Sequence, residues 1–333
     1  MTRPSQFYSF LAPQLRAYLE LRERLGYTSH TTPSRARQLD YYLCFRGIAS
    51  MAGIDEGLIV NWIHAVPASA TTKNGKLGFI RELFHHLMRQ GLVHENPAAR
   101  IPSLKVGPCR KPYIYSLREI RCILEEAGKL KARVPDRLLG WSLQTMILLI
   151  YACGLRLGEA LNLRIKDVDF EEKTLALWNT KFHKERIVPF SLEMGERLSA
   201  YLALCNGRRP QDGAEAPFFW WDGIRYPKSL IHRHFRDLLV RCGLSKPTGP
   251  GPRLHDLRHT FATHRLYKWY QDGKDPLNRL PWLSTYMGHV NIENTQVYLT
   301  IARELLREGD RRFQNTFEEL AEKAVGRVSQ DDP

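Results

Sequence analysis

The sequence predicts a mainly helical fold with a small antiparallel β-sheet (α+β), divided into two domains. Three observations lead to this prediction. Apolar residues recur at helical spacing through most of the chain. The period changes to short alternating runs between residues 167 and 190. A proline-rich basic segment follows the first hundred or so residues. With 333 residues, 43% of them hydrophobic, the chain can build two cores of ordinary size.

The first hundred residues are predicted to form a small helical bundle. Asp55 and either Ser69 or Thr71 are typical N-cap residues, and each precedes apolar residues at helical spacing. The predicted helices cover residues 5–27, 33–52, 57–66 and 69–91. In the second helix, the residues expected to face inward are Leu39, Tyr42, Leu43 and Phe45.

Lysines and arginines occupy the positions of this bundle that are expected to be exposed. A face that contacts phosphate groups and a plain solvated face explain this pattern equally well. The candidates for nucleic-acid contact are Arg35, Arg37, Lys73, Lys76 and Arg81.

Residues 96–116 contain four prolines, four Lys or Arg residues and no acidic residue, which predicts an extended, basic strap between the domains. Its Arg110 and Lys111 are further candidates for contact with a nucleic-acid backbone. We therefore expect a domain at 1–100, a linker at 101–115, a second domain at 116–325 and a disordered tail at 326–333.

The second domain is predicted to begin with a helix capped by Ser116 and Glu119, which form a capping-box pattern. A strongly apolar helix at 136–152 follows and ends at Cys153-Gly154. Arg156 then lies in the first turn of the next helix, and Glu159 lies three residues later on the same face.

Short β-like runs follow at Val168/Phe170, Leu175/Leu177 and Ile187/Val188, and they predict a small antiparallel sheet. Lys181 and Lys184 lie near its last turn. After a helix at 191–204, residues 228–244 form an amphipathic basic helix. Its Arg233 and Arg236 either face nucleic acid or form a plain solvated surface.

The residues with the strongest chemical character lie between 254 and 298. His255 and Arg258 are three residues apart on a predicted helix, so their side chains are neighbours. A guanidinium fits two phosphate oxygens, and an imidazole beside it can carry a proton near neutral pH. A turn at Gly288 precedes His289, and a short helix can return the Tyr298 hydroxyl, a known type of covalent nucleophile, to that histidine.

Four segments of the chain, in this order, resemble the tyrosine recombinase (integrase) family. They are ACGLRLGEALNL (152–163), TKFHKERIVPF (180–190), LHDLRHTFATH (254–264) and GHVNIENTQVYL (288–299). The resemblance implies a SAM-like, core-binding helical domain followed by a mixed α/β catalytic domain. The spacer between Arg258 and His289 is longer than in common members of the family.

The resemblance also implies a reaction, in which DNA is cut and rejoined through a 3′-phosphotyrosine. Tyr298 would be the nucleophile, Arg156 and Arg258 would neutralise the phosphate, and Glu159 would orient Arg156. Lys181, or alternatively Lys184, would protonate the leaving oxygen. His255 would assist proton transfer from Tyr298, and His289 would hydrogen-bond the phosphate.

The partners and cofactors expected follow from the same resemblance and from charge. A formal net charge of +14 favours a polyanion such as double-stranded DNA. We expect a homodimer or homotetramer on DNA, with the C-terminal helix exchanged between protomers. The phosphotyrosine link conserves bond energy, so no cofactor is expected. No metal site is expected either, because His255 and His259 lack a third ligand nearby.

The six cysteines show no C-x-x-C spacing and are expected to be free, buried thiols. Because no signal core and no run of about 18 apolar residues occurs, we expect a cytoplasmic protein that does not contact a membrane.

Three alternatives to a recombinase remain open: a type IB topoisomerase-like enzyme, a catalytically silent DNA-binding protein, and a basic protein that does not act on DNA. Within the recombinases, we favour an integrase or transposase of a mobile element.

Overall fold

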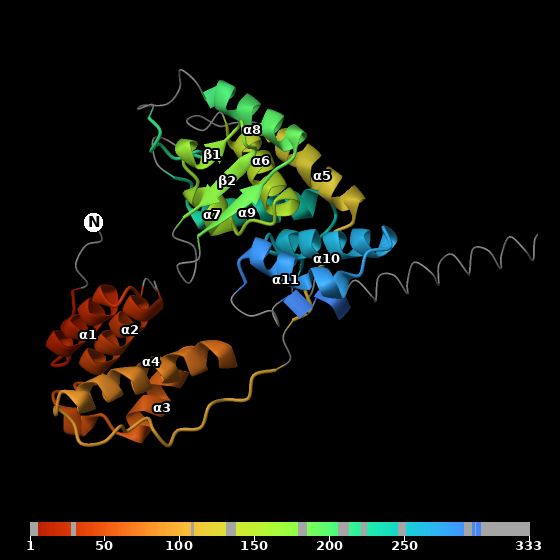
Figure 1. Ribbon diagram of the computed structural model, residues 1–333. Coiled ribbons are helices and arrows are strands. Elements are labelled where there is room, and N and C mark those ends of the chain that lie inside the picture. Colours follow the sequence, from red (N-terminus) through yellow and green to blue (C-terminus); the bar gives the residue numbers. More distant parts are fainter. Residues whose placement is uncertain are drawn as a thin grey trace, which may run out of the picture. The chain divides into compact units, whose positions relative to one another are not determined.

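The computed structural model divides into two compact units, Met1–Arg110 and Lys111–Pro333. Figure 1 shows the course of the chain through both units. The residues described are 6–27, 31–107, 110–130, 138–178, 185–205, 213–220, 225–245, 251–289, 295–296 and 298–300.

The described part of the first unit is a bundle of helices around one apolar core. Asp55 caps α3 by accepting a hydrogen bond from the Leu58 amide, and Ser69 caps α4 by accepting one from the Thr72 amide. The buried residues include Leu11, Leu43 and Trp62. The helices are α1 (Ala12–Arg24), α2 (Thr31–Phe45), α3 (Glu56–His64) and α4 (Ala70–Arg89), with a 3₁₀ turn η1 (Met51–Gly53).

Two expectations for this unit are wrong. Phe45 is 75% exposed at the last position of α2, because the helix ends there instead of continuing to residue 52. Lys76 is only 6% exposed. Its amine lies 5.1 Å from the centre of the Trp62 ring and donates to the Trp62 carbonyl, so its charge is held inside the bundle.

The beginning of the strap packs on the first unit. Arg81 donates hydrogen bonds to the carbonyls of Ala98 and Ile101, and Ile101 is buried in the first core. Asn74 exchanges two hydrogen bonds of 2.8 Å with the backbone of Leu104. Arg81 is half-buried, and its guanidinium binds the backbone of the strap.

The described part of the second unit places helices around a small sheet (Figure 1). Ser116 and Glu119 form the expected capping box at the start of α5. The helices are α5 (Leu117–Gly128), α6 (Leu139–Ala152), α7 (Leu157–Asn162), α8 (Leu192–Cys205), α9 (Lys228–Arg241), α10 (Asp256–Gln271) and α11 (Pro276–Met287), with a 3₁₀ turn η2 (Ile165–Asp167).

The sheet is antiparallel with the order β1-β2-β3, as the sequence predicts. β1 (Val168–Asp169) pairs with β2 (Thr174–Leu177), and β2 pairs with β3 (Arg186–Pro189). Leu175 lies opposite Val188, and both are fully buried. Lys181 and Lys184, between β2 and β3, lie outside the described residues.

The apolar helix α6 forms the centre of the second core and contacts α5, α7, α8 and α10. Its contact with α10 matters most for function, because α10 carries the His255–Arg258 segment. A smaller apolar cluster joins α10 to α11 and includes Phe261, Met287 and Tyr298.

The end of the strap is fixed to the start of α10. The Tyr115 amide donates to Thr260 Oγ1, and the Tyr115 hydroxyl donates to the Arg253 carbonyl, each at 3.0 Å. Tyr115 is fully buried, so these bonds are shielded from water. The segment leading to α5 is thereby held against the helix of the candidate site.

The cysteines are less uniform than expected. Cys153 and Cys205 are buried, but Cys44 is exposed and Cys122 and Cys242 are half-buried. Cys109 lies outside the described residues. None of the described helices is both long enough and apolar enough to cross a membrane.

Candidate active site

An ion pair at the first turn of α7 begins the site. Gly154, with φ of +64°, ends α6 and turns the chain so that Arg156 precedes α7. Arg156 Nη1 donates to Glu159 Oε1 at 2.7 Å, and the Arg156 amide donates to Oε2 at 2.8 Å. Arg156 Nη2 also donates to the Gly288 carbonyl at 2.8 Å, which links α7 to the end of α11.

Arg186, at the start of β3, binds the same carboxylate and was not predicted. Its two terminal nitrogens donate to the two oxygens of Glu159 at 2.9 and 2.8 Å, and its Nε donates to the Tyr286 carbonyl at 2.9 Å. The side chains of Arg186 and Glu159 are only 8% and 6% exposed. Burial raises the pKa of the Glu159 carboxyl, but Arg186 and then Arg156 outweigh it and lower that pKa to about 2.

Arg258 lies deepest in the site, with 1% of its surface exposed. Its terminal nitrogens donate to the carbonyls of Gly154 and Met287, so it joins the turn after α6 to the end of α11. Burial, followed by the charge of Arg156, lowers its pKa to about 9, which still leaves it charged at neutral pH. It lies 3.9 Å from Glu159.

The charges of this cluster do not cancel. Three described guanidinium groups, those of Arg156, Arg186 and Arg258, pair with or lie within 3.9 Å of the single carboxylate of Glu159. Two positive charges are therefore in excess. Such an excess, held by fixed donors and away from bulk water, favours an oxyanion.

His289 and Tyr298 lie beside each other after α11. Gly288 ends that helix in the left-handed region with φ of +64°. The rings of His289 and Tyr298 are stacked with centroids 6.2 Å apart, and His289 Nδ1 lies 2.7 Å from the hydroxyl of the buried Thr295. Burial lowers the pKa of His289 to about 3, with Arg258 as the second cause.

The Tyr298 hydroxyl lies 2.8 Å from Nδ1 of His259, the residue after Arg258. His255 contacts the same imidazole, with ring centroids 4.8 Å apart and the planes nearly perpendicular. Burial lowers the pKa of His255 to about 4, and the neighbouring His259 is the second cause. Burial also raises the pKa of Tyr298 to about 12, although Arg258 and Arg156 oppose that rise.

Six of the predicted site residues thus come together from segments far apart in the sequence. They are Arg156, Glu159, His255, Arg258, His289 and Tyr298. Two residues of the cluster were missed. Arg186 alternates with the exposed Ile187 on β3, so strand periodicity could have indicated its inward direction. His259 is four residues from His255, and in the sequence that spacing indicates only a possible metal pair.

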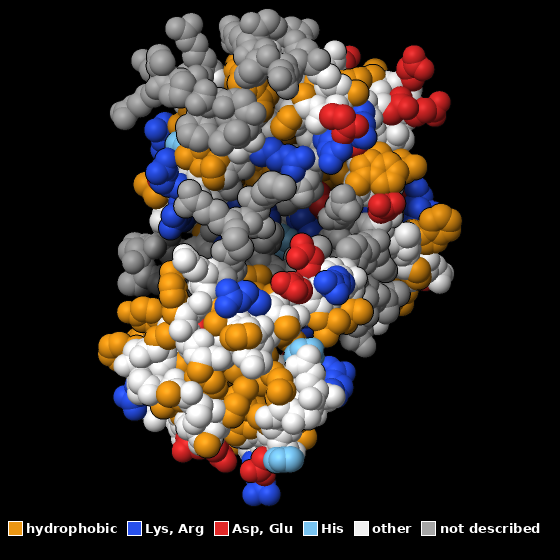
Figure 2. Space-filling view, turned by 90° about the vertical axis from the view of Figure 1, so that its left-hand side faces the viewer, with side chains coloured by type: hydrophobic (Ala, Val, Ile, Leu, Met, Phe, Trp, Pro, Cys, Tyr) orange, Lys and Arg blue, Asp and Glu red, His pale blue; other side chains and the backbone are white. Residues whose placement is uncertain are grey.

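The other basic candidates differ in exposure. Arg233 and Arg236 are exposed on α9, as are Arg37 in the first unit and Lys111 in the second. Arg35, Lys73 and Arg110 are half-buried. Figure 2 shows Lys and Arg side chains on the visible face of the second unit, with Asp and Glu among them.

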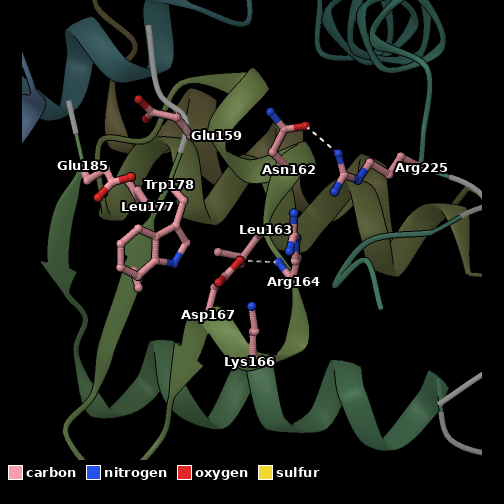
Figure 3. A pocket seen from close by; sticks show the side chains of 11 residues that line it. Glu159, Asn162, Leu163, Arg164, Lys166, Asp167, Leu177, Trp178, Glu185 and Arg225 are labelled. Carbon is pink, nitrogen blue, oxygen red and sulfur yellow. Dashed lines mark hydrogen bonds between the residues drawn. The ribbon is translucent and has the colours of Figure 1, made fainter. Parts of the chain in front are cut away.

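A separate polar hollow of about 360 Å³ lies beside Glu159 and is shown in Figure 3. Its walls carry charges of both signs. Arg164 and Lys166 form ion pairs with Glu215, and Arg225 donates to Asn162 Oδ1 at 3.1 Å. Because these partners offset the positive charges that line the hollow, the hollow attracts an anion only weakly. The Arg156–Arg186–Arg258 cluster is therefore the stronger candidate for binding a phosphate group. Within the described ranges, no group of three or more His, Cys, Asp or Glu residues could hold a metal ion.

Comparison with known proteins identifies the family. Residues 118–304 match the phage integrase family. A putative integrase/recombinase of Sinorhizobium fredii, y4rB, is 34% identical over 316 residues, which cover 91% of this chain and 96% of that protein. The tyrosine recombinase XerC of Myxococcus xanthus is 27% identical, over 90% of this chain and 95% of that protein.

Solved structures show the same fold at lower identity. A Tn1549 transposon integrase in complex with transposon right end DNA has a TM-score of 0.61 and 18% identity, with 89% of this chain and 98% of that chain covered. A lambda integrase dimer bound to a core site has a TM-score of 0.61 and 17% identity, with 86% and 76% covered.

Proposed function

The chain belongs to the phage integrase family of tyrosine recombinases, and from this premise we propose that it cuts and rejoins double-stranded DNA through a 3′-phosphotyrosine. The observation that carries the proposal is the juxtaposition of an excess of positive charge with a tyrosine hydroxyl. Arg258 and Arg156 donate to the carbonyls of Met287 and Gly288, and the next residue, His289, stacks on the Tyr298 ring. A phosphodiester held by these arginines would lie next to the nucleophile.

The reaction would proceed by attack of Tyr298 Oη on the scissile phosphorus, with release of a 5′ hydroxyl. Arg156 and Arg258 would neutralise the non-bridging oxygens as negative charge develops. Glu159 and Arg186 would hold Arg156 in position. Lys181, or Lys184 in its place, would protonate the leaving oxygen, and His289 would donate to the phosphate.

The partner proposed is double-stranded DNA, as in the complexes of the Tn1549 and lambda integrases. Exchange between two duplexes requires several active sites, so we propose a homodimer or homotetramer on DNA, with the C-terminal segment exchanged between protomers. The relative y4rB favours the role of an integrase, and the Tn1549 neighbour favours a mobile element. The phosphotyrosine preserves the energy of the broken bond, so the reaction needs neither ATP nor a metal ion.

Covalent trapping tests the proposal. Nicked duplexes from the DNA flanking the gene would be incubated with the wild-type protein, Tyr298→Phe and the control Tyr286→Phe, and adducts resolved on a denaturing gel. Tyr286 is a suitable control because its hydroxyl donates to the Pro189 carbonyl at 3.4 Å and not to the candidate site. We expect adducts with wild type and Tyr286→Phe only. Adducts with Tyr298→Phe would exclude Tyr298 as the nucleophile.

A further inference from the structure

The imidazole of His259 is the group that contacts the reactive atom of Tyr298. Its Nδ1 lies 2.8 Å from Tyr298 Oη, and the two ring centroids are 5.5 Å apart. Tyr298 is only 3% exposed, so its hydroxyl is largely removed from bulk water. This distance is that of a hydrogen bond between two groups that can exchange a proton.

The position of His259 is fixed by its neighbours on α10. Arg258, the preceding residue, is bonded to the backbone on both sides of the site, at Gly154 and Met287. One turn earlier, His255 packs nearly perpendicular to the His259 ring. The helix that places Arg258 in the guanidinium cluster therefore directs the next side chain, His259, toward the Tyr298 hydroxyl.

The other two histidines are less suited to the same task. His289 stacks on the Tyr298 ring, but its Nδ1 is close to Thr295 Oγ1, at 2.7 Å. The ring that His255 contacts is that of His259, at 4.8 Å between centroids, and not that of Tyr298. Of these three histidines, His259 is thus the one within hydrogen-bond distance of the Tyr298 hydroxyl, whereas His289 and His255 make ring contacts beside it.

We propose that His259, and not His255, accepts the proton of Tyr298 during DNA cleavage. This inference rests on the function proposed above. As the Oη–P bond forms and the P–O5′ bond breaks, the Tyr298 proton passes to His259 Nδ1, and the general acid gives a separate proton to O5′. In the joining step, the O5′ hydroxyl attacks phosphorus and gives its proton back to the general acid, the P–Oη bond breaks, and the imidazolium returns its proton to Oη.

The protonation states before reaction agree with this direction of transfer. Burial lowers the pKa of His259, so its imidazole is neutral and can accept a proton at pH 7. Burial raises the pKa of Tyr298 to about 12, so the phenol keeps its proton until a base removes it. A tyrosine in this state requires the kind of base that His259 provides.

The test measures single-turnover adduct formation by full-length His259→Gln, His259→Ala and His255→Gln. His264→Gln is the matched control, because His264 lies on the same helix but contacts the Tyr151 hydroxyl at 3.2 Å. We expect both His259 variants to form adduct at least about 100-fold more slowly, with unchanged DNA affinity, and His264→Gln to match wild type. His255→Gln should be affected less than either His259 variant.

A second measurement separates a base from a residue that only positions the tyrosine. A fluorinated tyrosine at position 298 has a lower phenol pKa and depends less on a base. It should restore most of the rate of His259→Ala if His259 removes the proton. A duplex with sulfur at the 5′ bridging position should restore Lys181→Ala, which lacks the general acid, but not His259→Ala.

The possible results are distinguishable. His259 variants that react within about threefold of wild type, or that gain nothing from fluorotyrosine, would overturn the role of His259 as base. A wild-type protein that forms no adduct would instead overturn the proposed function, and the inference would fall with it.

Discussion

Arg186 and Arg164 each pair with a glutamate, but in different surroundings. The Arg186 and Glu159 side chains are 8% and 6% exposed, whereas those of Arg164 and Glu215 are 37% and 65% exposed. Removing Arg186 leaves Glu159 paired with Arg156, but it takes away two buried charge-assisted hydrogen bonds to that carboxylate, and water does not replace them. An exposed charge that loses its partner is solvated instead.

We therefore predict that Arg186→Ala lowers the free energy of unfolding of the second unit by about 3 kcal/mol. Arg164→Ala, the matched control, should cost less than about 1 kcal/mol. Arg186→Lys should also be destabilising, because one ammonium cannot replace two parallel guanidinium bonds. Guanidinium chloride titrations monitored by fluorescence measure all three. Equal losses for Arg186→Ala and Arg164→Ala would refute the structural role of the buried pair.

For single residues, the sequence predicts those site residues that belong to a recognisable motif. It does not predict those whose role depends on a contact with a residue distant in the chain. Arg156, Arg258, His289 and Tyr298 belong to motifs with recognisable spacing. The role of Arg186 depends on Glu159, 27 residues earlier, and that of the His259 imidazole on a tyrosine 39 residues later. Strand periodicity can indicate that Arg186 points inward, but a single sequence gives no signal for which distant residue such a side chain meets.

At the scale of elements, the turn between α6 and α7 is constrained more tightly than a helix end usually is. Gly154 has φ of +64°, and a Cβ built there would lie 2.7 Å from the Phe261 ring on α10. Gly243, after α9, has φ of +68° but no atom within 4 Å of the corresponding position. Both glycines need the left-handed conformation, but only Gly154 also needs the space.

Gly154→Ala should therefore be more destabilising than Gly243→Ala, by about 1–3 kcal/mol. The common cost of the left-handed conformation cancels in this comparison, which leaves the contact with Phe261. Because Phe261 lies three residues after Arg258 on α10, Gly154→Ala should also slow adduct formation. Calorimetric unfolding of both variants measures the difference. Equal unfolding temperatures would show that α10 moves aside without cost.

The elements themselves were largely predictable, and their ends were less so. The capping residues Asp55, Ser69 and Ser116 mark helix starts because local hydrogen bonds determine them. The predicted second helix extends seven residues beyond the end of α2, and for this reason the prediction places Phe45 in the core, where the structure does not have it. Gly47, two residues after Phe45, marks that end: it has φ of +65°, and its amide donates to the Cys44 carbonyl at 3.0 Å. The sequence therefore contains the stop signal, and the apolar residues that follow it belong to a separate turn.

At the scale of the whole molecule, the net charge of +14 indicates a DNA-binding surface only when the exposed Lys and Arg residues that contribute to it are identified. Lys76 is buried and Arg81 holds the strap, so neither projects freely from the first unit. Arg233 and Arg236 are exposed on α9, and Arg118 and Arg121 are exposed on α5. The two pairs contribute equally to the net charge of the protein. If DNA binds at one defined surface, only the pair that lies on that surface contributes to binding.

We predict that replacing Arg233 and Arg236 by Gln lowers the slope of log K against log salt by about 2 for duplex binding, because each phosphate contact contributes about 0.9. The same replacement of Arg118 and Arg121 removes equal charge and should change the slope by less than half as much. Fluorescence anisotropy with a labelled duplex between 50 and 300 mM salt, roughly the range in which phosphate contacts weaken, provides both slopes. Equal changes would mean that DNA responds to the total charge of the protein, and that α9 has no special place in the complex. A larger change for the α9 pair would assign that helix to the DNA-binding surface.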